Sequence, residues 1–236
     1  MGSIYLIRHG QASFGAENYD VLSPLGFQQS AALGDYLDQM GIRFDRCVSG
    51  ELNRQQDTAR ATLQRMSPHG KHQPPLEVDA AFNEFRADEV IRAHMDDLLA
   101  AEPGAMQVFA NAANHRAEFQ RLFKYVIQRW VSGEHEKQDL ESWQSFVDRV
   151  QAGLSRLLEQ ADRKDQIAVF TSGGTITALL QLLIGVSPIK AFELNWQIVN
   201  TSVSRLKYRD QDVALASFNG HAHLELLQNP ELVTYR

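Results

Sequence analysis

The sequence predicts an α/β fold with three layers, in which helices cover both faces of a mainly parallel central sheet. Two observations support this class. Short apolar runs at residues 3–7, 44–48 and 166–171 alternate with longer stretches whose apolar residues recur at helical spacing. Each of these runs is also followed by a glycine within three residues. This is typical of parallel strands whose carboxyl ends meet at one ligand-binding edge.

The first part of the chain contains three expected strands and two expected helices. In chain order they are a strand at 3–7, a helix from 24 to 41, a strand at 44–48, a helix at about 52–66 and a strand at 76–79. Ser23 and Pro24 are residue types preferred at a helix cap and at the first helical position. Gly41 is typical of a helix end. Three prolines at residues 67–75 indicate a loop before the third strand.

The second part begins with a segment of a different kind. Residues from about 87 to 140 are predicted to be mostly helical, with a break at Pro103-Gly104 and an apolar stripe ending at Trp130. We expect a single domain of residues 1–236 in which this helical insert lies over the active-site edge of the sheet. The remaining expected elements are a helix at about 143–157, a strand at 166–171, a helix around 176–183, and strands at 202–208 and 213–218.

Composition limits the function classes. The chain has 236 residues, 44% of them hydrophobic, and a net charge of -6, which argues against general nucleic-acid binding. No apolar run reaches membrane-spanning length, and we expect no secretion signal from the residues at the start of this sequence. Cys47, the single cysteine, cannot form an internal disulfide and is expected to be a buried strand thiol. We expect a cytoplasmic protein without nucleic-acid or membrane partners; the sequence leaves the oligomeric state open.

The tripeptide Arg8-His9-Gly10 follows the first strand. A neutral imidazole nitrogen can attack phosphorus and carry a phosphoryl group. An adjacent arginine can bind phosphate oxygens and disfavours a protonated imidazole. Gly10 would let the backbone approach a phosphate closely. On these three residues alone, a surface Arg-His pair at a strand end remains an equal alternative.

Two further segments lie at the expected ends of strands. Arg54 falls near a helix start, where a cation opposes the helix dipole and a bound anion would compensate; a solvated arginine is the alternative. Ser172 and Gly173 open a helix whose unpaired N–H groups favour an anion, although a plain helix cap by Ser172 or Thr171 fits equally well. Glu84 is a candidate acid for protonating a leaving group, but the residues alone do not distinguish it from other glutamates.

Histidine pairs at His69 and His72 and at His221 and His223 raise the alternative of a metal site. No carboxylate or cysteine with ligand spacing accompanies either pair, so no metal site is predicted.

Taken in order, these pieces resemble the histidine phosphatase superfamily, which includes phosphoglycerate mutases and small-molecule phosphatases. The resemblance rests on residues 6–11 and 22–26, on 49–59 with Arg54, on Asn83-Glu84, and on 200–203 and 219–224. It implies a phosphohistidine at His9, phosphate binding by Arg8 and Arg54, and acid-base work by Glu84, without a metal or other cofactor. It further implies that Gly10, Gln11, Ser172 and Gly173 contact the substrate. Ser172 stands where the family usually has a second histidine.

Three functions are compatible with this resemblance. The first is a phosphatase for a small phosphorylated substrate. The second is a mutase, although residues 11–20 lack the Trp-Asn pattern typical of mutases. The third is a degenerate member that binds a phosphorylated ligand without turnover because Ser172 cannot carry charge.

Overall fold

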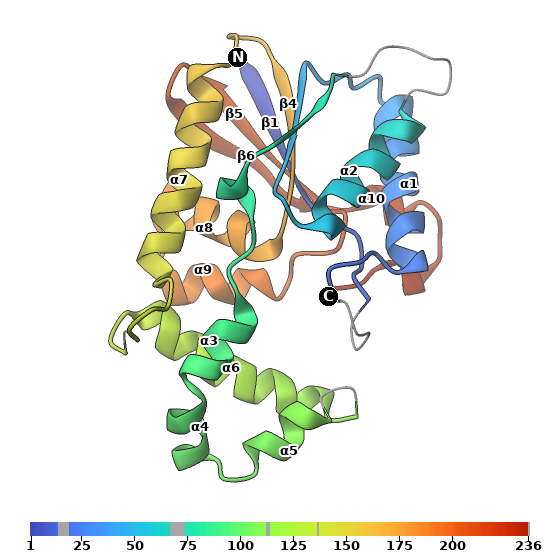
Figure 1. Cartoon of the computed structure of the whole chain (residues 1–236). Helices are drawn as coiled ribbons and strands as arrows, with labels where there is room; N and C mark the ends of the chain where they lie inside the picture. Colours follow the sequence, from blue (N-terminus) through green and yellow to red (C-terminus); the bar gives the residue numbers. More distant parts are fainter. Residues whose placement is uncertain (14–18, 67–73, 112–113, 136, 236) are drawn as a thin grey trace. The chain divides into compact units, whose positions relative to one another are not determined.

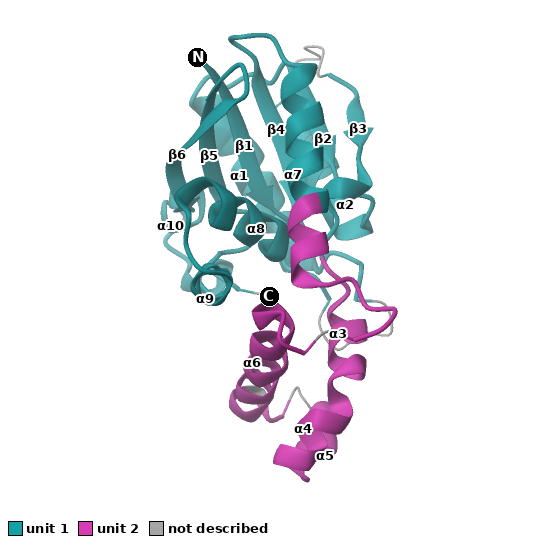
Figure 2. Ribbon diagram, turned by 90° about the vertical axis from the view of Figure 1, so that its left-hand side faces the viewer, with its two compact units in different colours: residues 1–84, 149–236 teal, residues 85–148 magenta. Residues whose placement is uncertain are grey.

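The computed structural model describes residues 1–235 except 14–18, 67–73, 112–113 and 136. The chain divides into two compact units (Figures 1 and 2). Unit 1 comprises residues 1–84 and 149–236, and unit 2 comprises residues 85–148. The sequence placed the helical insert at about 87–140, within unit 2. Its predicted position over the sheet edge stays a prediction.

Unit 1 contains a six-stranded sheet with the order β3-β2-β4-β1-β5-β6. The strands are β1 (Gly2–Arg8), β2 (Arg46–Ser49), β3 (Leu76–Val78), β4 (Gln166–Thr171), β5 (Val203–Arg209) and β6 (Asp212–Gly220). The β1–β4, β2–β4 and β2–β3 pairs are parallel, and the β1–β5 and β5–β6 pairs are antiparallel. The predicted mainly parallel α/β class is therefore confirmed.

Strand register determines which loops meet. Arg8 at the end of β1 lies opposite Thr171 at the end of β4, and Ser49 at the end of β2 lies opposite Phe170. Parallel strands that end at the same level deliver their following loops to one edge of the sheet. The residues after β1, β2 and β4 therefore converge there, as the sequence predicted.

Helices cover both faces of this sheet (Figure 1). One face packs on α1 (Pro24–Gln39) and α2 (Asn53–Arg65) through a buried cluster of Tyr5, Ile7, Leu33, Leu37, Phe44, Cys47, Ala59, Leu63, Met66, Ala168 and Phe170. Side chains alternate along a strand, so Ile4 and Leu6 point to the opposite face, where α7 (Trp143–Glu159) and α8 (Gly173–Ile184) lie. Both β1 and β4 are buried throughout apart from Gln166, which explains their continuous apolar sequences.

Some boundaries differ from the prediction. Strand β2 begins at Arg46 rather than at residue 44, and the ring of the preceding Phe44 packs edge-on against Tyr5, with the ring centroids 5.4 Å apart. The helix α9 (Pro188–Asn195) was not predicted. Shorter elements complete unit 1: η1 (Ala80–Phe82), α10 (Ala222–Glu225) and η2 (Pro230–Leu232).

Unit 2 contains α3 (Ala87–Ala93), α4 (Met95–Ala101), α5 (Ala105–Ala110), α6 (Arg116–Ser132) and the first turns of α7. The predicted break at Pro103-Gly104 falls between α4 and α5. Its core is aromatic: Trp130 lies 4.8 Å from Phe85 and 5.4 Å from Trp143, measured between ring centroids. Rings at this spacing add stabilisation beyond the area that they bury.

The longest helices, α6 and α7, have 17 residues each. Within the described part of the chain, none combines the length and the apolar character needed to cross a membrane. The cytoplasmic location expected from the sequence stays a prediction.

Candidate active site

The backbone at the end of β1 is fixed by its neighbours. The N–H of His9 donates to Thr171 O at 2.8 Å, and the Asn200 side-chain amide donates to His9 O at 3.0 Å. Thr201 adopts a left-handed backbone conformation, with φ of 59°, and its N–H donates to Arg8 O at 3.1 Å. His223 supports this turn, because its Nε2 lies 2.9 Å from Thr201 Oγ1. These contacts hold residues 8 and 9 in one geometry.

The ring of His9 is buried, with 3% of its surface exposed. Its Nδ1 lies 2.7 Å from Gly10 O. Because a carbonyl oxygen only accepts, Nδ1 carries the hydrogen, and Nε2 of the neutral ring presents its lone pair. That lone pair faces Arg54 Nε at 3.3 Å. Burial first, and then the charges of Arg54 and Arg8, hold the pKa of His9 well below its ordinary value.

Arg54 is the second residue of α2 and is 7% exposed. Its Nη1 pairs with Asp20 Oδ1 at 2.8 Å, and its guanidinium carbon lies 5.2 Å from the centroid of the Tyr19 ring. Asp20 also accepts from the backbone N–H groups of Asn53 and Arg54 at 2.8 and 3.3 Å. The sequence assigned the compensating anion at this helix start to a ligand. In the structure, the carboxylate of Asp20 fills that role, since Leu52 at the N-cap makes no side-chain bond.

The guanidinium of Arg8 is anchored by backbone carbonyls. Nη1 donates to Ile198 O, and Nη2 donates to Tyr235 O at 3.0 Å. Its Nε is buried and has no hydrogen-bond partner among the described residues. A Cβ built on Gly173 would lie 3.8 Å from this Nε, so the group faces the start of α8. The pKa of Arg8 is lowered, chiefly by burial, an effect opposed by Tyr19 and Glu84.

The carboxylate of Glu84 binds the N-terminus of α8. Gly174 N–H donates to Glu84 Oε2 at 3.1 Å, at a position where a helix stabilises negative charge. Neither predicted capping residue caps this helix. Ser172 makes no side-chain cap bond, and Thr171 Oγ1 donates to Phe82 O at 2.7 Å. The Ser172 hydroxyl instead accepts from Gln55 Nε2 at 2.8 Å.

Gly10 and Gln11 have structural partners. The predicted approach of Gly10 to a phosphate stays a prediction; in the structure Gly10 also lies close to α1. A Cβ on Gly10 would lie 2.6 Å from Gly26 O, and the Gly10 N–H already donates to Thr58 Oγ1 at 2.9 Å. The Gln11 side chain accepts from Ser23 Oγ at 2.8 Å. Both residues thus join the end of β1 to α1.

The two histidine pairs considered as a metal site differ in how far the structure describes them. His221 Nδ1 lies 2.7 Å from Asn219 O, and His223 Nε2 lies 2.9 Å from Thr201 Oγ1. His69 and His72 lie outside the described residues. In the described ranges, no three His, Cys, Asp or Glu side chains gather in a group able to hold a metal ion.

Sequence reasoning missed Asp20 and Gln55. Asp20 lies in a polar loop, where a single acidic residue carries no signal. Gln55 follows Arg54 directly, yet its amide reaches Ser172, which is 117 positions away. Only the convergence of β2 and β4 brings these two side chains together.

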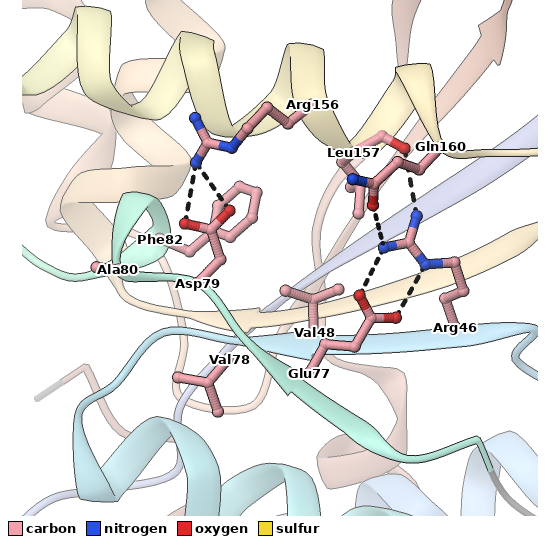
Figure 3. A pocket seen from close by; sticks show the side chains of 10 residues that line it. All are labelled: Arg46, Val48, Glu77, Val78, Asp79, Ala80, Phe82, Arg156, Leu157 and Gln160. Carbon is pink, nitrogen blue, oxygen red and sulfur yellow. Dashed lines mark hydrogen bonds and ion pairs between the residues drawn. The ribbon is translucent and has the colours of Figure 1, made fainter.

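A separate cavity of about 340 Å³ lies in unit 1 beside β3 (Figure 3). Arg46 pairs with Glu77 at 2.6 Å, and Arg156 pairs with Asp79 at 2.8 Å. Both guanidiniums here have a carboxylate partner, as Arg54 does, whereas Arg8 Nε at the His9 edge has no hydrogen-bond partner among the described residues, so the His9 edge is the better anion site.

Comparison with known proteins points to one family. A model of the histidine phosphatase superfamily (branch 1) matches residues 4–221. A 2,3-bisphosphoglycerate-dependent phosphoglycerate mutase from Methylobacterium is 31% identical over 100 residues. That match spans 40% of this chain and about half of the relative, 47% of its length.

Solved structures share the fold. A phosphoglycerate mutase from Bacillus anthracis has 19% identity and a TM-score of 0.66, with 97% of each chain covered. A phosphoserine phosphatase from Entamoeba histolytica, in complex with phosphoserine, has 19% identity and a TM-score of 0.65 over 95% of this chain and 100% of that one. A mycobacterial glucosyl-3-phosphoglycerate phosphatase has 19% identity and a TM-score of 0.62, covering 93% and 99%.

Proposed function

The chain belongs to the histidine phosphatase superfamily (branch 1), and from this premise we propose that it hydrolyses small phosphomonoesters through a phosphohistidine on His9. One observation carries the proposal. His9 is a buried, neutral imidazole whose Nε2 lone pair faces a guanidinium at 3.3 Å. A ring held in this state is a ready nucleophile, and the adjacent cation can receive the anion that it attacks.

The first step forms a phosphorus–nitrogen bond. The Nε2 lone pair of His9 attacks phosphorus, the ester P–O bond breaks, and the leaving oxygen takes a proton from the carboxyl of Glu84. Arg54 Nε–H faces the lone pair in the free protein, so it turns to a phosphate oxygen when that lone pair bonds phosphorus. Arg8 Nε, which has no hydrogen-bond partner, supplies a further donor.

The second step returns the site to its starting state. A water oxygen attacks phosphorus and gives its proton to the carboxylate of Glu84 while the P–N bond breaks. Inorganic phosphate leaves, and His9 is again neutral. The Gly174 N–H bond to Glu84 at 3.1 Å supports the position proposed for this group, because it fixes the carboxyl at the start of α8 beside Ser172 and Gly173.

Ser172 takes the position of the family's second histidine in this proposal. Its hydroxyl donates a hydrogen bond to the phosphate but carries no charge. By analogy with the loss of one preorganised donor, the substitution lowers the rate about a hundredfold, equivalent to roughly 3 kcal/mol. Gly173 lets the phosphate approach Arg8 Nε, while Gly10 and Gln11 position the loop after β1.

A phosphoglycerate mutase is the second candidate, because the curated relative that matches at 31% identity is one. A mutase returns the phosphoryl group to another hydroxyl of a phosphoglycerate, whereas a phosphatase releases it to water. The third candidate, a binder without turnover, predicts phosphate affinity and no product.

The test is incubation with p-nitrophenyl phosphate, with phosphate release and an acid-labile phosphoenzyme as readouts. We expect both in the native protein and neither in His9→Ala. Turnover that persists in His9→Ala removes His9 as the nucleophile. Incubation with 3-phosphoglycerate then separates isomerisation from hydrolysis.

A further inference from the structure

The amide of Gln55 makes two hydrogen bonds inside the protein. Gln55 and Ser172 are both fully buried. Gln55 Nε2 donates to Ser172 Oγ at 2.8 Å and to Phe82 O at 3.1 Å. Because a backbone carbonyl only accepts, the group facing Phe82 must be the NH2 end of the amide. Both amide hydrogens are therefore used, and the orientation of the amide is determined.

This orientation fixes the role of the Ser172 hydroxyl. Its oxygen accepts from Gln55, so its own hydrogen remains to be donated. No acceptor for that hydrogen occurs among the described residues, and the hydroxyl does not cap α8. Ser172 follows Thr171, which lies opposite Arg8 in the sheet, and precedes Gly173, which faces Arg8 Nε. Ser172 therefore lies in the chain between two residues that face Arg8, and its hydroxyl hydrogen makes no hydrogen bond to a described residue.

Gly50 lies directly against the amide of Gln55, where only a glycine fits. A Cβ on Gly50 would lie 2.0 Å from Gln55 Oε1 and 2.7 Å from Asn83 Oδ1, so no larger residue fits beside the amide. Gln55 Oε1 is itself buried without a hydrogen-bond partner. Burying an unsatisfied oxygen opposes folding, and packing alone would favour an apolar side chain here.

We propose that Gln55 is a positioning residue that sets Ser172 as a hydrogen-bond donor to the transferring phosphoryl group. By occupying the hydroxyl oxygen, the amide leaves the hydroxyl only its donor role, and it polarises the O–H bond toward the phosphate. This inference rests on the proposed function. It identifies the group that compensates, in part, for a neutral serine at this position.

The test is a double-mutant cycle on kcat/KM for p-nitrophenyl phosphate. Ser172→Ala is expected to lower kcat/KM about a hundredfold. Gln55→Leu is expected to lower it about tenfold through kcat in the native background, and less than twofold when Ser172 is already alanine. If Gln55→Leu costs the same factor in both backgrounds, it does not act through Ser172 and the inference fails.

A second variant separates orientation from packing. Gln55→Glu keeps the size of the side chain, but its carboxylate accepts the Ser172 hydrogen and reverses the bond. We expect Gln55→Glu to be as slow as Ser172→Ala and slower than Gln55→Leu. Equal rates for the two Gln55 variants would overturn the inference. Gln166→Leu is the matched control. It removes a glutamine that contacts Tyr5 at the opposite end of β4, and it should change kcat/KM less than twofold.

The outcomes also separate this inference from the proposed function. Turnover that needs His9, combined with additive Gln55 and Ser172 effects, overturns the inference alone. If the native protein does not turn over, the same cycle is measured as affinity for orthophosphate, and additivity there again overturns it. A native protein that neither hydrolyses the ester nor binds orthophosphate removes both proposals.

Discussion

Arg54 Nε lies 3.3 Å from His9 Nε2, so the guanidinium faces the ring nitrogen that has the lone pair. The contact has two consequences. It disfavours a proton on that nitrogen, and it places a cation where a phosphoryl group would approach. The same pair therefore links the protonation state of the ring to anion binding.

This pairing predicts an unusual pH response. The pKa of His9 is lowered by burial, Arg54 and Arg8, so the ring stays neutral as the pH falls through 6.5. We expect kcat/KM to keep its value down to pH 6 as far as His9 is concerned. NMR titration of the ring nitrogens should show a neutral His9 at that pH. In Arg54→Gln the pKa should rise, because one of the depressing charges is gone. A native His9 that titrates near 6.5 contradicts the prediction.

The carboxylate of Asp20 pairs with Arg54, so a phosphate bound beside His9 would compete with Asp20 for the same guanidinium. In Asp20→Asn the cap on α2 is kept, but the negative charge near the site is removed. We expect orthophosphate to inhibit more tightly, by about threefold to tenfold at low salt, because a like charge no longer opposes the anion. The inhibition constant measures this. An unchanged or weaker constant means that Asp20 serves mainly to orient Arg54.

Asp20→Ala provides the matched stability control, since it also removes the cap. It should lower the free energy of unfolding by about 1 kcal/mol more than Asp20→Asn does, measured by urea denaturation.

Gln55 occupies the space beside Ser172, so a histidine at position 172 needs that space. We expect Ser172→His alone to lower the free energy of unfolding by about 1–3 kcal/mol through overpacking. Adding Gln55→Ala should recover most of this loss and raise kcat above that of Ser172→His alone. Denaturation and steady-state assays of the three variants test both points. Equal stability of the single and double variants would show that the side chains do not compete for space.

His223 contributes a pH-dependent part of the stability. Burial, and then His221, lower its pKa to about 4, against an ordinary value of 6.5. Between these values the unfolded chain binds the proton and the folded protein does not, so stability falls as the pH falls. From pH 7 to pH 4 the loss due to His223 should be about 3 kcal/mol.

His223→Gln keeps a donor for Thr201 but cannot titrate. Urea denaturation at a series of pH values should give it a shallower decline below pH 6.5 than the native protein. Parallel curves for the two proteins would assign the acid sensitivity to other groups.

The elements of the fold that depend on neighbouring residues could be predicted from the sequence. The apolar runs of β1 and β4, the Ser23-Pro24 start of α1 and the glycine at position 41 all act on neighbours in the chain, and the structure has them close to their predicted positions. The apolar run at 44–48 predicted β2 to begin two residues early, because Phe44 is buried in the core without belonging to the strand, and apolar character alone does not separate the two cases.

Site residues that lie in a sequence motif could be predicted. Their hydrogen-bond partners, which are distant in the sequence, could not. His9 and Arg54 were predicted as neighbours, and they are. The side chains that bind Arg54 and Ser172 were not predicted. The Asp20 carboxylate reaches Arg54 across 34 positions, and the Gln55 amide reaches Ser172 across 117. Such contacts depend on strand order, which no local pattern carries.

The bond from Arg8 to the carbonyl of Tyr235 ties the first strand to the far end of the described chain. A change that displaces the Tyr235 carbonyl therefore acts directly on a guanidinium in the proposed reaction centre, although the two residues are 227 positions apart.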